Sequence, residues 1–130
     1  MALPAVLQRL SLPVIASPMF IVSYPELVLA QCKAGIVGSF SALNARPVEL
    51  LDAWLTQIED GLAAHREAHP DAVIGPIAVN QIVHPSNVRL EHDVRVCVDH
   101  KVPIFSPACA RRRRRSCRRC TATAASCCTT

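Results

Sequence analysis

Glycine and aromatic residues are both scarce in this sequence. Only four of the 130 residues are glycine. Their positions allow neither a G-x-G-x-x-G dinucleotide motif nor a Walker loop, which weighs against a Rossmann or P-loop fold. Aromatic residues make up 4% of the chain, so few side chains are available for stacking on nucleic-acid bases.

Long apolar segments and early cysteines are also lacking. No apolar run approaches the roughly 20 residues that a membrane helix requires, and the amino terminus lacks the basic start and apolar stretch of a signal peptide. Before residue 106 the only cysteines are Cys32 and Cys97. Both lie in predicted helices and are predicted to be packing residues rather than a disulfide. We therefore expect a cytoplasmic protein with no membrane partner.

Charge divides the chain into two parts. Residues 1–105 contain seven basic and ten acidic residues, a formal charge of −3, whereas residues 106–130 contain seven arginines and no acidic residue. The second part also holds five of the seven cysteines and shows neither helical nor strand periodicity. The acidic part is typical of an enzyme domain rather than a nucleic-acid binder. We predict a domain over 1–105 and a disordered tail over 106–130.

The tail contains two motifs that resemble binding sites. Cys117 and Cys120 resemble half of a zinc site, but zinc needs four preorganised ligands, so no metal site is predicted. The arginine run 111–115 neutralises phosphates without reading sequence. We therefore expect non-specific nucleic-acid binding by the tail, and a small basic nucleic-acid-binding protein remains an alternative function.

Apolar runs and helical periodicity alternate through the first part of the chain. Strands are predicted at 12–16, 36–40, 77–83 and from 102 to 105, and helices follow the first three. Ser23 is the predicted N-cap of the first helix, Gly35 its end and Pro47 the start of the second. The order β-α-β-α-β-α-β, with continuously apolar strands, predicts an α/β fold with a parallel sheet. Periodicity alone leaves open a doubly wound sheet or part of a (β/α) barrel.

In both folds the chemistry lies at the carboxyl ends of the strands. Ser17, Pro18 and Met19 follow the first strand, and Pro18 either presents backbone groups to a flat ligand or simply ends the strand. Asn80 either binds the edge of a heterocycle or ties down the next loop. His84 and His92 are candidate bases, but we expect a loop hydrogen bond for His84 and a surface position for His92.

Two blocks of the sequence resemble the nitronate monooxygenases, formerly called 2-nitropropane dioxygenases. The first block is 12–19, followed by Ser23, and the second is 77–80 with 84–93. The similarity covers residues 4 to about 105. The Ala-x-Pro-Met part of the first block is shared with other flavin barrels, so a fragment of an FMN-dependent enoyl-thioester reductase is the alternative enzyme.

The resemblance implies the amino-terminal part of a flavin-type TIM (β/α)₈ barrel that oxidises alkyl nitronates with O₂ to a carbonyl compound and nitrite. It further implies that Ser17, Pro18, Met19 and Asn80 contact FMN. The catalytic histidine and the phosphate-binding strand ends of the family match no residue of this chain, so no catalytic residue is assigned.

The tail fits a change of reading frame. Codons can be chosen for 106–110 that, read two bases later, give Thr-Ser-Leu-Arg, which resembles the continuation of the strand in the family. The same offset turns 121–130 into a plausible helix end and strand, Gly-Tyr-Gly-Gly-Ile-Val-Leu-His-Asp. We therefore interpret 106–130 as a frameshift product and expect the chain to be an inactive, truncated fragment.

Overall fold

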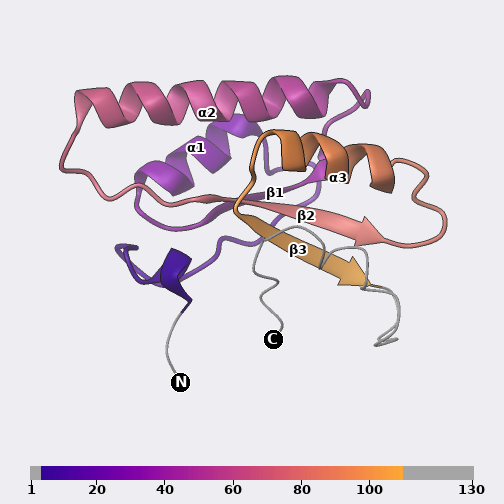
Figure 1. The fold of residues 1–130 in the computed structure, drawn as a ribbon, viewed down its shortest axis with the longest axis horizontal. Helices are drawn as coiled ribbons and strands as arrows, with labels where there is room; N and C mark the ends of the chain where they lie inside the picture. Colours follow the sequence, from indigo (N-terminus) through magenta and orange to yellow (C-terminus); the bar gives the residue numbers. More distant parts are fainter. Residues whose placement is uncertain (1–3, 110–130) are drawn as a thin grey trace.

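Three helices lie on one face of a small parallel sheet in the computed structural model, which describes residues 4–109 (Figure 1). The elements in chain order are η1 (Ala5–Leu7), α1 (Pro25–Lys33), β1 (Gly38–Ser41), η2 (Ala42–Asn44), α2 (Leu50–Ala68), β2 (Ile77–Val83), α3 (Leu90–Asp99) and β3 (Ile104–Cys109). The mixed α/β class and the alternation of helices with parallel strands are as predicted. The described strands form an open sheet, not a closed barrel.

The sheet has the order β1-β2-β3, so each strand lies beside the one that precedes it in the sequence. Both pairs are parallel. Ile15 forms a further parallel bridge with Val37. The segment 12–16 therefore lies beside the β1 end of the sheet.

The predicted first strand, 12–16, is reduced to this single bridge. Pro13 has no N–H to donate, and the Val14 N–H turns back to the Leu12 carbonyl at 2.8 Å. This three-residue turn bends the chain where the apolar pattern predicted an extended run. Only Val14 and Ala16 reach the sheet, through hydrogen bonds of 3.1 and 2.9 Å with Val37.

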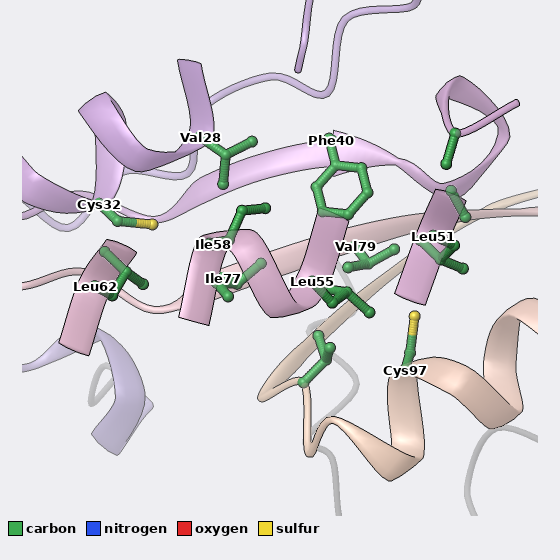
Figure 2. Close-up of a cluster of buried hydrophobic side chains, with 13 residues drawn as sticks. Val28, Cys32, Phe40, Leu51, Leu55, Ile58, Leu62, Ile77, Val79 and Cys97 are labelled. Atoms are coloured by element: carbon green, nitrogen blue, oxygen red, sulfur yellow. The ribbon is translucent and has the colours of Figure 1, made fainter. Parts of the chain in front are cut away.

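The main core lies between the sheet and the helices (Figure 2). Leu51, Leu55 and Ile58 of α2 share one helix face at three- and four-residue spacing and are fully buried against Phe40 and Val79 of the sheet. Burying side chains of this size contributes about 1.5–3 kcal/mol each. This core fixes the face of the sheet on which the helices lie.

Cys32 and Cys97 belong to this core as packing residues, as predicted. Cys32 and Cys97 are free and have no exposed surface. Burial raises the pKa of both thiols, and that of Cys97 to about 12, despite a hydrogen bond from Gln81. These thiols are inert packing groups, because the thiolate is the reactive form.

Two helix starts differ from the predictions. Tyr24, not Ser23, is the N-cap of α1. The Ser23 hydroxyl instead accepts the Met19 N–H at 3.0 Å, which closes the loop before the helix. The second helix begins at Leu50, because Pro47 starts a separate turn in which its carbonyl accepts the Leu50 N–H at 3.1 Å.

The fourth strand, predicted at 102–105, extends beyond Phe105 in the structure. The strand continues to Cys109, with Ser106 beside Asn80 and Pro107 beside Gln81. Strands pair through backbone groups. The side-chain composition of residues 106–109 therefore did not indicate that they continue the strand. The predicted disorder of 110–130, the arginine run and Cys117 with Cys120 lie outside the described residues.

Helix α3 ends in a Schellman motif that places Lys101 in a left-handed conformation. The Lys101 N–H bonds the Val98 carbonyl at 2.9 Å and the Val102 N–H bonds the Cys97 carbonyl at 3.0 Å. The φ of Lys101 is 53°. Glycine is the usual residue there, because a Cβ in this conformation costs about 1 kcal/mol.

His100 links the end of α3 to α2. Its Nε2 lies 3.0 Å from Asp52 Oδ1 and its Nδ1 lies 3.2 Å from Glu59 Oε2. Burial lowers the pKa of His100, whereas the hydrogen bonds and negative charges of Asp52 and Glu59 raise it, and the net direction is upward from 6.5. The imidazolium form therefore favours the docking of α3 on α2.

We predict that this link makes folding stability depend on pH. A pKa raised by folding gives a stabilisation that is fully present below the unfolded-state pKa of about 6.5 and lost as pH rises through the folded-state value. Urea unfolding of the wild type and of His100→Gln across this range measures the effect. The difference between the two should shrink as pH rises, and a constant or growing difference would contradict the assignment.

Candidate functional site

Polar side chains gather on the face of the sheet that carries no helix, toward the carboxyl ends of the strands. Because side chains alternate along a strand, Ser39, Ser41 and Asn80 lie opposite to Phe40 and Val79. Ser39, Ser41 and Asn80 are 2%, 5% and 9% exposed. Toward the amino ends the same face is apolar and packs against Leu7 of η1. The polar half is the candidate site.

Ser39 and Asn44 hold the loop that follows the first bridge. The Ser39 hydroxyl donates to the carbonyl of Ala16, immediately before Ser17. The Asn44 amide donates to the carbonyls of Met19 and Ser23 at 3.0 and 3.2 Å. The loop 16–23 is therefore fixed at both ends by side chains from β1 and η2.

Asn80 sits at the centre of this face. Its Nδ2 donates to the Ser106 carbonyl at 2.8 Å, so the amide ties β2 to β3 rather than to the next loop. Register places Ser41 on one side of Asn80 and Ser106 on the other. A side-chain amide has further donor and acceptor capacity beyond one bond, and its flavin contact stays a prediction.

The three predicted loop residues lie at the same end of the sheet as Asn80. Ser17 and Met19 are exposed and Pro18 is half-buried. The backbone of Met19 is fixed through its N–H and its carbonyl, both bonded to Ser23. Loop and strand thus place an apolar side chain, a hydroxyl and an amide around one end of the sheet, which suits a flat heteroaromatic ring.

The cations described at this end of the sheet are already bonded to other groups of the protein. Phosphate recognition needs free cations or a group of backbone N–H donors. At this end, the Arg46 guanidinium stacks on the Phe20 ring at 5.3 Å. Arg89 is bound to Ala45 and Asp93. Both of these arginines are therefore engaged within the protein.

The two histidines considered as bases occupy the positions that the sequence predicted. His84 Nδ1 lies 2.7 Å from Ser86 Oγ and accepts the Ser86 N–H, which makes a closed turn. His92 is 51% exposed on α3, beside the buried Asp93 at 3.4 Å. His92 therefore lies on a helix, whereas His84 follows the carboxyl end of β2.

Comparison with protein-family models, curated proteins and solved structures returns no match to this chain. Within residues 4–109, no group of three or more His, Cys, Asp or Glu side chains is placed to hold a metal ion. The helices of that same part of the chain include none with the length and apolarity to span a membrane.

Sequence reasoning missed Asn44 as a site residue. It lies three residues beyond β1, in a short 3₁₀ turn, and no motif of the sequence includes it. The only available signal was a polar residue shortly after a strand end, which is common in loops. Its two hydrogen bonds depend on the position of a loop more than 20 residues away.

We predict that Asn44→Ala loosens the loop 16–23 without unfolding the sheet. Removing both donors leaves the Met19 and Ser23 carbonyls to water, at a cost of roughly 1–3 kcal/mol. Hydrogen exchange of the Met19 and Ser23 amides should accelerate. The matched control, Asn87→Ala, removes a similar bond to the Ile82 carbonyl and should leave those amides unchanged. Equal protection in wild type and Asn44→Ala would contradict the role.

Proposed function

We propose that residues 4–105 are the amino-terminal part of an FMN-dependent (β/α) barrel that oxidises alkyl nitronates with O₂ to a carbonyl compound and nitrite. The observation that carries the proposal is the arrangement of the strands. Four successive parallel segments lie side by side in chain order, with the α-helices α1, α2 and α3 on one face. A (β/α) barrel is wound in this way.

A doubly wound sheet fits this order less well. Doubly wound sheets reverse their strand order at a switch point and place helices on both faces. Here no reversal occurs from the bridge at Ile15 to β3. The candidate site then corresponds to the mouth of the barrel, where Ser17, Pro18, Met19 and Asn80 would contact the flavin ring.

Pro107 supports the change of reading frame proposed for 106–130. Proline lacks the N–H that a sheet ladder needs and is tolerated mainly on edge strands. Strand β3 is an edge of the described sheet, but in a closed barrel no strand is an edge. A proline in the middle of this strand thus suits a sequence that was not selected for a barrel interior.

We propose that the 130-residue polypeptide does not turn over nitronates. Its described residues would contribute ring contacts, but no residue of the chain matches the catalytic histidine or the phosphate-binding strand ends that the resemblance implies. The loss of a general base alone costs about 10²–10⁴-fold in rate.

The prediction is tested by measuring nitronate-dependent O₂ consumption with added FMN. No activity above that of free FMN is expected. A gene in which the reading frame is restored after codon 105 provides the positive control, and its product should bind FMN and turn over. Asn80→Ala in the restored form should weaken FMN binding. Turnover by the 130-residue chain with stoichiometric FMN would contradict the inactive-fragment proposal, and a restored form without activity would contradict the family.

A further inference from the structure

A second concave site lies at the opposite end of the sheet. A cavity of about 420 Å³ opens among the segment after η1, the second half of α2 and the turn between α3 and β3. Its apolar floor is formed by Leu62, Ile77 and Val102, which are 5–7% exposed. We call it the amino-end pocket, because it lies before the first residues of β2 and β3.

Three cationic side chains from separate parts of the chain line this pocket. They are Arg9, Arg66 and Lys101, and all three are exposed. Within residues 4–109 none of them forms a salt bridge. The one carboxylate in the pocket lining, Glu59, is bonded to His100. The pocket therefore has an excess of unpaired positive charge.

The position of Lys101 adds an independent observation. It occupies the left-handed C′ site of α3, where glycine would fold with less strain. Strained backbone conformations of this kind concentrate at functional sites. A lysine at this site brings an ammonium group to the pocket at the expense of helix-end stability.

We propose that the amino-end pocket binds a phosphate monoester with a small apolar body. A phosphate dianion matches the excess charge of Arg9, Arg66 and Lys101, and arginine binds phosphate oxygens through paired N–H donors. The apolar body packs on Leu62, Ile77 and Val102. The site lies at the opposite end of the strands from Asn80 and is independent of the proposed flavin site.

Phenyl phosphate is the probe, titrated into the full 130-residue chain and followed by calorimetry. Lys101→Gly is the main variant, because it removes the cation and relieves the strained backbone, so misfolding does not explain a loss of binding. We expect its affinity to fall roughly tenfold, the effect of losing one charge-assisted hydrogen bond. Arg66→Gln should weaken binding to a similar extent, and phenol should not bind.

Two controls separate this pocket from the rest of the chain. Arg95→Gln removes an exposed cation that does not line the pocket, and replacing Arg111 to Arg115 by glutamine removes the basic run of the tail. Both should retain binding, as should Asn80→Ala. Binding that survives Lys101→Gly and Arg66→Gln, binding that disappears with the tail arginines, or no binding of phenyl phosphate to the wild type would each overturn the proposal.

Discussion

A parallel sheet has to be covered on both faces, and this constraint governs the whole molecule. One face is covered by α2, which packs an almost continuous apolar stripe against the sheet. Helices α1 and α3 flank α2 (Figure 1). Phe40 of β1 links the sheet to α2. Its side chain is fully buried, and the centroid of its ring lies 5.9 Å from that of the Trp54 ring. The packing on this face sets where the strand ends, and therefore all their loops, are placed.

The other face is covered only in part. Leu7 packs against Val37, Ala78 and Ile104 toward the amino ends. Beyond them the face turns polar at Ser39, Ser41 and Asn80, and the side chains of Ser39 and Asn80 donate to the backbone carbonyls of Ala16 and Ser106. This change from apolar to polar along one sheet face is what makes the carboxyl end a candidate ligand site, as in barrels whose chemistry lies at that end.

Most of the architecture could be predicted from the sequence, because it depends on local patterns. The spacing of Leu51, Leu55, Ile58 and Leu62 predicted both α2 and its buried face, and the apolar runs predicted β1 and β2. The errors arose where a local pattern competes with a specific hydrogen bond. Pro13 reduced a predicted strand to a bridge, and Ser23 bonds Met19 instead of capping α1.

The sites were less predictable than the fold. Ser17, Pro18, Met19 and Asn80 share one end of the sheet, as their positions after strands implied, but the amide of Asn44 that fixes the loop had no sequence signal. The amino-end pocket joins Arg9, Arg66 and Lys101 from segments that are separated by more than 30 residues. Such a combination follows only from the packing of η1, α2 and α3.

The central proposal is that the sequence up to about Phe105 belongs to a barrel and that the residues after it are read in a different frame. The nucleotide sequence from codon 104 through several hundred further bases tests it most directly. The account predicts that the frame two bases later stays open beyond codon 130 and encodes further strand and helix units, with a glycine-rich strand end and a histidine. Stop codons in that frame between codons 106 and 130 would contradict it.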